Sequence, residues 1–397
     1  MVNLLKGNKS LLIISLIAIV NALGYGIVFP ILYSYSLRFG LSDFQNGLLF
    51  ASFSVCQFLA TPIIGRMSDK YGRRPMLLFS LVGTALSFFT LAFAPSVLFL
   101  FLGRMLDGIT AGNIPVAMAV ISDTTEPKDR PRGFGIIAAS FGFGFVFGPT
   151  ISALTVGISP SLPFIIAGII SIVAVLATFF FLSETNKHIG RIQHHGKLFD
   201  FGKLIKAASD PNVGPTLLIT LFYFMAFFQF IYAFQPFTIK VLGLSPNQIA
   251  ALFTAFGVIG LISQLFLVQR AVKMLGLKRA YSMAFLVVIF CFFVMFLNKL
   301  LIPFIIVNFI LGFANSLIQP LTTTILSNET DSASQGSIMG LNSSYMSIGQ
   351  IMGPILGGAF ASIALPLPFL AAGLTAVFCF YLSFKVLKPG VKKDSAF

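Results

Sequence analysis

Charged residues are scarce in this chain. Its 397 residues include 26 Lys and Arg but only 12 Asp and Glu, so charged residues make up 10% of the sequence. A soluble domain is close to one quarter charged, whereas this chain is 57% hydrophobic and has a mean hydropathy of +0.94. This composition excludes an ordinary soluble protein and predicts an integral membrane protein.

Histidine and cysteine are also scarce, with three of each. Cys56, Cys291 and Cys379 fall in different apolar runs, which argues against a disulfide framework or a cysteine-rich metal site. The histidines share one polar stretch, so a histidine relay within the membrane is excluded. The sequence also lacks a phosphate-cradling loop and a nucleophile with a plausible base. We therefore expect no enzymatic activity, no metal and no cofactor, and energy from an ion gradient or from the substrate's own gradient.

Long apolar runs dominate the rest of the sequence. About 20 apolar residues in a helix cross a bilayer, and twelve runs approach or exceed this length. The predicted spans are residues 10–32, 45–64, 75–95, 98–122, 132–154, 161–183, 214–240, 248–269, 279–297, 300–326, 337–360 and 366–387. The first run lacks a cleavage pattern of small residues, so we expect it to be retained as a span.

The basic residues are distributed asymmetrically around these spans. With the N-terminus inside, 22 of the 26 Lys and Arg fall in cytoplasmic segments, whereas Arg38, Lys240 and Lys299 lie at outer ends and Arg104 lies within a span. This asymmetry is the positive-inside pattern. The net charge of +14 therefore reflects topology rather than nucleic-acid binding. We expect both termini to be cytoplasmic, and the compact chain with short loops indicates a bacterial inner membrane.

The second half of the sequence repeats the first at an offset of 205 positions, without gaps from span 4 to span 6. Glycines and prolines hold one register through this region. The matched pairs include Pro115 with Pro320, Gly135 with Gly340, Gly144 with Gly349, Gly148 with Gly353, Pro149 with Pro354 and Pro163 with Pro368. Chance would not align so many glycines and prolines.

The repeat predicts an all-α membrane protein whose twelve transmembrane helices form two pseudo-symmetric six-helix halves. The halves are residues 1–183 and 214–397, and a mostly basic cytoplasmic linker, residues 184–213, joins them. Parallel repeats of this kind occur in secondary transporters, where the substrate site lies between the halves near the membrane centre and one half rocks against the other.

A basic loop punctuated by glycine separates spans 2 and 3. It resembles the signature loop of the major facilitator superfamily. The motif positions are Gly65, Asp69, Gly72, Arg73 and Arg74. The resemblance covers essentially the whole chain and implies the major facilitator fold with alternating access.

Spans 4 and 5 resemble a narrower branch of this family. The spacing in span 5 is similar to the drug–proton antiporter signature, although Ser152 and Ala153 replace its usual terminal glycines, and the second copy is complete through Gly357 and Gly358. The two copies are Gly135, Gly144, Gly148 and Pro149, and Gly340, Gly349, Gly353 and Pro354. The stretch 103–108, followed by Gly112 and Asn113, is similar to span 4 of tetracycline-exporter-like members.

The family resemblance implies that Asp69 and Arg73 form a cytoplasmic latch that favours one access state. Asp69 would lie at the end of span 2, within reach of Arg73 or of the positive N-terminal end of another helix. Gly65 and Gly72 would permit a tight turn between antiparallel helices. The alternative is a charged loop that only sets topology and anchors the helices.

The span 5 motif predicts close helix packing. Gly144 and Gly148 are four residues apart, so they share a helix face and permit a neighbouring backbone to approach. Pro149 removes a backbone donor and bends the helix. Because the pattern recurs in the second copy, we expect both motifs to pack at the interface between the halves, which must reshape during rocking.

Arg104 and Asp107 are the only ionisable pair predicted deep within a span, three residues apart on one helix face. Charges in lipid are costly and usually face a cavity. We expect Asp107, tuned by Arg104, to titrate during the cycle and to couple transport to protons. The alternative is a static pair of mutually neutralising charges. Spans 1 and 7 carry Asn21 and Gln229 rather than acids, which weakens proton coupling and keeps a uniporter open.

Polar and aromatic side chains in the predicted cavity spans are candidates for substrate contact. They are Asn21, Tyr25, Asn113, Tyr223, Gln229, Tyr232, Gln235, Asn315, Gln319, Asn342 and Tyr345. Each could instead make an interhelical hydrogen bond, the commoner use of Asn and Gln in membrane helices. The scarcity of charge favours a neutral, amphipathic or weakly ionised substrate.

Together these patterns predict a secondary transporter that exports drug-like or amphipathic small molecules in exchange for protons. The alternatives are an uncoupled or symporting carrier of a small neutral metabolite, a lipid or lysolipid translocator, and a non-transporting receptor on the same scaffold. The intact loop and glycine–proline motifs argue against the receptor. We expect a monomer, since one chain supplies both halves, with the substrate, protons and the bilayer as its partners.

Overall fold

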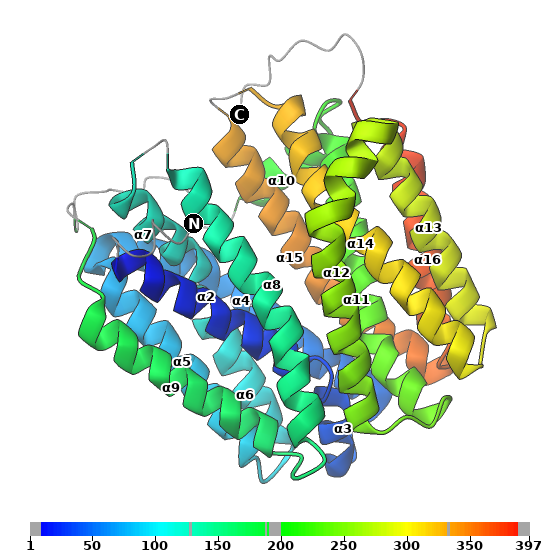
Figure 1. Cartoon of the computed structure of the whole chain (residues 1–397), viewed down its shortest axis with the longest axis horizontal. Coiled ribbons are helices and arrows are strands. Elements are labelled where there is room, and N and C mark those ends of the chain that lie inside the picture. The colour runs from blue at the N-terminus through cyan, green and yellow to red at the C-terminus, as the bar shows by residue number, and fades with distance from the viewer. Residues whose placement is uncertain (1–8, 127–128, 187–188, 190–199, 332–333, 388–397) are drawn as a thin grey trace. The chain divides into compact units, whose positions relative to one another are not determined.

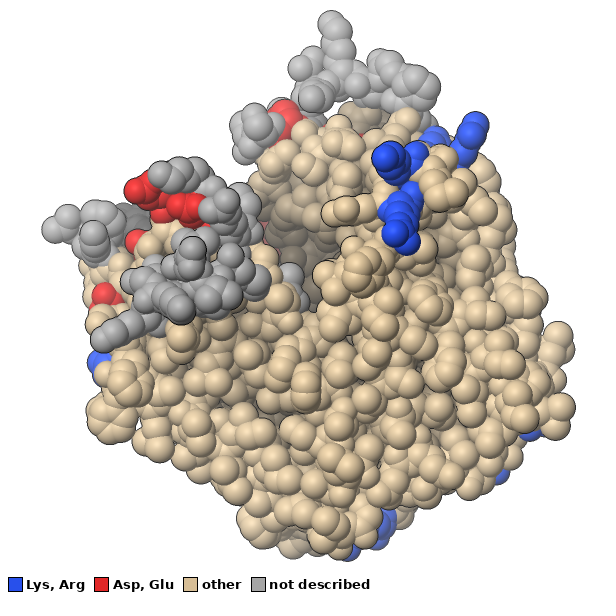
Figure 2. Space-filling view, viewed as in Figure 1, with Lys and Arg blue, Asp and Glu red and all other residues tan. Residues whose placement is uncertain are grey.

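The computed structural model describes residues 9–126, 129–186, 189, 200–331 and 334–387. Every regular element in these residues is helical, which confirms the predicted all-α class (Figure 1). Eleven helical segments are long and apolar enough to cross a membrane, and a twelfth apolar helix, α16 (Leu367–Ser383), has 17 residues. On the face shown in Figure 2, charged side chains gather towards the ends of the helices, as expected for a membrane-spanning protein.

The first compact unit takes in residues 1–41, 52–198 and 245–254. Its helices are α2 (Lys9–Val28), α3 (Leu32–Ser36), η1 (Leu37–Phe39), most of α4 (Asp43–Tyr71), α5 (Arg73–Ala92), α6 (Val97–Thr110), α7 (Ile114–Thr124), α8 (Arg130–Thr155) and α9 (Leu162–Phe181). Within this unit α2 packs on α8, and α5 packs on both α6 and α9.

The second compact unit takes in residues 42–51, 199–244 and 255–397. Its helices are α10 (Phe201–Ala208), α11 (Gly214–Lys240), most of α12 (Pro246–Leu275), α13 (Leu277–Leu297), α14 (Leu301–Glu329), α15 (Gln335–Ile363) and α16. Here α11 packs on α15, and α13 packs on both α14 and α16. The two units therefore pair corresponding helices, in agreement with the sequence repeat.

The repeated glycines explain the closest of these pairings. A Cβ atom added to Gly148 would lie 2.7 Å from the Cα of Gly26 in α2, and one added to Gly353 would lie 2.7 Å from the carbonyl oxygen of Met225 in α11. Only glycine permits backbones to approach so closely. Each of these two glycines packs on a helix of its own unit, and the expectation that the motifs also pack at the interface between the halves stays a prediction.

The other members of the motif divide in the same way. A Cβ added to Gly144 would lie 2.5 Å from the carbonyl carbon of Ala22, and one added to Gly349 would lie 2.5 Å from the carbonyl oxygen of Leu221, so both pack like their partners. A Cβ on Gly135 would meet no atom within 4 Å. Gly135 therefore makes no comparable close approach.

The loop between the second and third spans is shorter than the sequence indicated. Helix α4 continues to Tyr71 and α5 begins at Arg73, so Gly72 alone makes the turn. Gly72 has φ of 104°, a conformation that favours glycine. Gly65 lies within α4, and a Cβ there would meet no atom within 4 Å, so its predicted part in the turn was wrong.

The fourth span differs between the units although both carry the aligned proline. In the first unit the span is broken into α6 and α7 around Gly112 and Asn113, and Pro115 lies at the start of α7, where its missing N–H is tolerated. In the second unit α14 runs unbroken through Pro320. Because of the break, Arg104 and Asp107 lie on α6, whereas a separate helix, α7, extends to the latch.

Candidate functional site

A buried ion pair lies inside the first unit. Arg104 and Asp107 are three residues apart on α6, with Nη1 of Arg104 3.4 Å from Oδ2 of Asp107. The two residues are only 2% and 7% exposed. A 3.4 Å contact is weak for a charge-assisted hydrogen bond, which is normally nearer 2.8 Å. The carboxylate and the guanidinium thus retain capacity for another partner.

The surroundings of Arg104 are mostly apolar. Its guanidinium carbon lies 4.5 Å from the centre of the Phe53 ring, a cation–π distance. Its Nε atom is buried and makes no hydrogen bond to any residue that the structure describes. The guanidinium is thus held by one weak ion pair and one aromatic ring.

A small cavity adjoins the ion pair and is lined by residues of α2, α4, α5 and α6. Asn21, Tyr25, Phe53, Arg104 and Asp107 contribute to its wall. It has room for about one water molecule. This cavity is therefore too small for a drug-sized ligand.

Most of the remaining polar groups of this site are paired with one another, although the buried Thr84 hydroxyl in the cavity wall makes no hydrogen bond to a described residue. The side-chain amides of Asn21 and Asn113 exchange hydrogen bonds of 3.0 and 3.3 Å. The Tyr25 hydroxyl donates to Oε1 of Gln57 at 3.0 Å. Two predicted substrate-contact residues, Asn21 and Tyr25, thus line the cavity beside the ion pair, and a third, Asn113, is bonded to Asn21. All three make interhelical hydrogen bonds, which is the alternative use of such residues.

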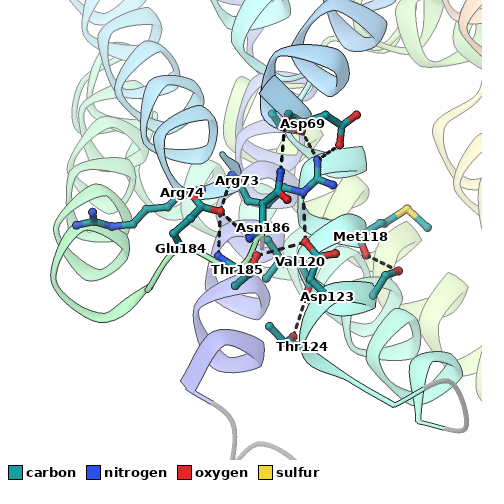
Figure 3. Close-up of polar contacts among 12 residues, drawn as sticks. Asp69, Arg73, Arg74, Met118, Val120, Asp123, Thr124, Glu184, Thr185 and Asn186 are labelled. Atoms are coloured by element: carbon teal, nitrogen blue, oxygen red, sulfur yellow. Dashed lines mark hydrogen bonds and ion pairs between the residues drawn. The ribbon is translucent and has the colours of Figure 1, made fainter. Parts of the chain in front are cut away.

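A second polar cluster lies at the junction of α4 and α5 (Figure 3). Nη1 of Arg73 lies 2.6 Å from Oδ1 of Asp69 and donates to Oγ of Ser68 at 2.6 Å. Nε of Arg73 lies 3.3 Å from Oδ2 of Asp123 at the end of α7. Arg73 is 9% exposed, so one largely buried guanidinium bridges α4 and α7. We refer to Asp69, Arg73 and Asp123 as the latch cluster.

Arg74 has a different role in the geometry. Its Nη2 donates to the carbonyl oxygen of Phe179 at 2.6 Å, and its guanidinium carbon lies 5.3 Å from the Phe179 ring centre. Arg74 thus packs on α9 and stays outside the latch cluster. Of the five motif residues, the structure brings Asp69 and Arg73 together, while Gly72 makes the turn between them.

The segment after α9 also joins this cluster, and the sequence reading missed it. The Glu184 carboxylate accepts hydrogen bonds from the backbone N–H groups of Arg73 at 2.9 Å and Arg74 at 3.1 Å, which caps the start of α5. Nδ2 of Asn186 donates to the Asp69 carbonyl at 3.2 Å. The sequence did carry a signal for these contacts. Asp123 and Glu184 are acids at span ends, on the same predicted side of the membrane as the basic loop.

The remaining substrate candidates lie in the second unit, and most have partners there. Tyr223 donates its hydroxyl hydrogen to the side-chain oxygen of Asn315. Oδ1 of Asn342 accepts from the Thr220 hydroxyl at 2.7 Å. Tyr345 donates to the Leu204 carbonyl at 2.6 Å. These side chains hold helices of the second unit together.

Three candidates in α11 and one in α14 complete the set. Tyr232 donates to the Asp43 carbonyl, and Gln235 is fully buried. Gln229 is also buried, and its Nε2 makes no hydrogen bond to a described residue. Gln319 is exposed. Gln319 thus has an exposed side chain, and Gln229 has a buried amide nitrogen without a described partner.

Comparison with known proteins gives a consistent family. The Major Facilitator Superfamily profile matches residues 14–266 and 216–397. The class B tetracycline resistance protein of Escherichia coli is 31% identical over 385 residues, which cover 91% of this chain and 90% of that protein. Multidrug resistance protein 2 of Bacillus subtilis (strain 168) is 29% identical over 362 residues, which cover 89% of each chain.

Solved structures share the fold at lower sequence identity. The human organic anion transporter MFSD10 has a TM-score of 0.71 at 21% identity and covers 94% of this chain and 99% of its own. A bacterial homolog of the human lysosomal transporter Spinster has a TM-score of 0.76 at 17% identity and covers 96% and 98%. With helix pairing, sequence profile and fold in agreement, this chain belongs to the Major Facilitator Superfamily of membrane transporters.

Proposed function

We propose that this transporter exports drug-like or amphipathic small molecules in exchange for protons. The observation that carries the proposal is the buried Arg104–Asp107 pair beside a cavity with room for water but not for a drug. Relatives are named for resistance to tetracycline, to multiple drugs and to quinolones. Their names favour export of amphipathic compounds over carriage of neutral metabolites or lipids.

Asp107 carries the coupling proton in this proposal. A proton on the Asp107 carboxylate removes the negative charge that faces Arg104, which leaves the guanidinium as an uncompensated buried cation. That state is costly within a membrane protein unless Arg104 finds another acceptor or the site rearranges. The cost gives the protonated and deprotonated forms different preferences for the two access states, which is the requirement for coupling.

The substrate is proposed to bind away from this cavity. Gln229 has an amide nitrogen without a described partner and Gln319 is exposed, whereas Asn342 and Tyr345 are engaged in hydrogen bonds within their unit. The aromatic side chains that are abundant in the spans would suit an amphipathic compound. Replacing Gln229 by Leu is expected to raise the substrate concentration for half-maximal transport.

The latch cluster is proposed to stabilise one access state. Arg73 bridges Asp69 and Asp123, and all three lie on the side assigned to the cytoplasm by the positive-inside pattern. We further propose a monomer, since one chain supplies both halves, in a bacterial inner membrane with both termini cytoplasmic. Asp69→Asn should change transport rates at normal membrane levels, and an unchanged rate would reduce the cluster to an anchor.

The function is tested with purified protein in liposomes that contain a trapped pH dye. Tetracyclines, quinolones, amphipathic cations and neutral metabolites are added in turn to acid-loaded vesicles. An exported compound should drive proton release, and Asp107→Asn should abolish that release. The matched control is Asp200→Asn, because Asp200 caps a short helix outside the spans. Transport by the wild type without proton movement would support a uniporter instead.

A further inference from the structure

A short helix outside the predicted spans carries an apolar face that the transport mechanism does not use. Helix α10 precedes the spanning helix α11 in the second unit, in the stretch predicted only as a linker (Figure 1). The Asp200 side chain accepts a hydrogen bond from the Lys203 N–H at 3.0 Å and caps its start. This cap fixes the first turn of α10.

One side of α10 is fixed to the second unit. Ala207 is fully buried, and Leu204 and Ala208 pack on the cluster that contains Leu217 and Tyr345. The Tyr345 hydroxyl donates to the Leu204 carbonyl at 2.6 Å. Because the side chain of α15 holds the backbone of α10, the helix has a set rotation and its exposed face has a defined direction.

The adjoining face is apolar and exposed. Phe201 and Ile205 are 62% and 71% exposed, and they are four residues apart, so they lie within about 40° of each other around the helix. Lys203 and Lys206 are exposed on the far side, more than about 100° away. The helix is therefore amphipathic, with an apolar strip beside its packed side and cations opposite.

The position of α10 favours the bilayer surface as the occupant of this strip. Helix α11 enters its span directly after the short connection that follows α10. The end of α12 and the start of α13, which Gly276 joins, lie on the same predicted side of the membrane and carry further basic residues. Lys and Arg side chains gather there in Figure 2, and Arg270, Lys273 and Arg279 are exposed. Such a surface complements anionic headgroups.

We infer that α10 lies in the cytoplasmic surface of the bilayer, with Phe201 and Ile205 inserted below the headgroups and Lys203 and Lys206 paired with the phosphates of anionic lipid. Interfacial helices bind in this way, through a buried apolar face and basic residues above it. A protein partner is disfavoured because two apolar side chains fall far short of the roughly 800 Å² that each partner buries in a specific interface.

The chain contains no tryptophan, so one introduced tryptophan reports its own environment. Phe201→Trp, Ile205→Trp and, as the matched control, Lys203→Trp are reconstituted separately as full-length protein in anionic vesicles. Brominated lipids should quench the tryptophan at 201 and 205, and aqueous iodide should quench the one at 203. Iodide quenching at 201 and 205 without lipid quenching would overturn the proposal, as would equal lipid quenching at all three positions.

A second comparison tests the role of the lysines. In vesicles of phosphatidylglycerol, each of the substitutions Lys203→Gln and Lys206→Gln should lower the ratio of inserted to uninserted α10 roughly fivefold. In purely phosphatidylcholine vesicles the same changes should have little effect. Equal insertion in both lipids with and without the lysines would contradict headgroup pairing. The two independent tryptophan sites keep the test informative if one variant fails to fold.

Discussion

The two units use the same helix pairing around different interiors. At the repeat offset, Arg104 and Asp107 of the first unit correspond to Phe309 and Gly312 of the second. The second unit has instead a core of packed phenylalanine rings that includes Phe230, Phe234, Phe237, Phe304 and Phe369. The difference shows that the duplicated helix pairing is retained whether these two positions carry an ion pair, as in the first unit, or Phe309 and Gly312, as in the second.

The ends of the units show a second contrast. In the first unit the acidic side chain of Glu184, after the last helix, binds backbone N–H groups at the start of α5. In the second unit Nζ of Lys278, at the start of α13, donates to the Phe384 and Val386 carbonyls at 2.9 and 2.8 Å. Both contacts join the chain after the sixth helix to the third helix, with opposite charges.

The largest effect is expected from breaking the framework that both units share. Gly148→Leu and Gly353→Leu should each abolish recovery of monodisperse protein in detergent, because each side chain would enter a neighbouring backbone. Gly135→Leu is the control, since a Cβ there meets nothing within 4 Å. Normal recovery of one variant and loss of the other would show that the two packings are not equivalent.

Removal of Arg73 from the latch cluster should destabilise the protein more than removal of Lys278, which occupies the same repeat position in the second unit. Arg73→Ala leaves Asp69 and Asp123 without their shared cation and should lower the free energy of unfolding by about 2 kcal/mol, which thermal denaturation in detergent would measure. Lys278→Ala removes bonds to two carbonyls only, so its effect should be smaller. The reverse order would mean that the second unit relies more on its end contacts.

A smaller effect is expected at Glu184. Glu184→Gln removes the negative charge at the start of α5 and should cost about 0.5–1 kcal/mol, since the site is exposed. The loss should diminish with added salt, which a melting series at increasing ionic strength would show. A loss independent of salt would assign the contact to hydrogen-bond geometry rather than to charge.

The smallest effect is expected at the ion pair between Asp43 and Lys240. The Nζ–Oδ1 distance is 2.8 Å, but the Lys240 side chain is 39% exposed. Exposed pairs contribute about 0–1 kcal/mol. Lys240→Gln should therefore leave the melting temperature almost unchanged, and a shift as large as that of Arg73→Ala would show that burial does not rank these pairs.

Local pattern made much of this structure predictable. Hydropathy located the spans, and the spacing of the repeated glycines predicted that helices would pack closely. The ion pair between Asp69 and Arg73 joins residues four apart and could be foreseen. Contacts between distant residues could not be foreseen, because Asp123 and Glu184 reach Arg73 from 50 and 111 positions away.

Two further features depended on tertiary context. Pro115 and Pro320 occupy the same repeat position, yet only the first lies beside a break, where Gly112 and Asn113 precede it. Helix α10 was also missed, since eight residues in a polar linker form a helix only when Leu204 and Ala207 are packed on the second unit. Short segments of this kind are determined by their packing more than by their own propensity.

The most direct test of proton coupling compares two transport modes of Asp107→Asn in the same liposomes. Exchange of labelled for unlabelled substrate at equal pH needs alternating access only, whereas accumulation driven by a pH gradient also needs the coupling proton. The account predicts that Asp107→Asn retains exchange and loses accumulation. Accumulation by Asp107→Asn equal to that of the wild type would contradict it and leave the Arg104–Asp107 pair as a static structural element.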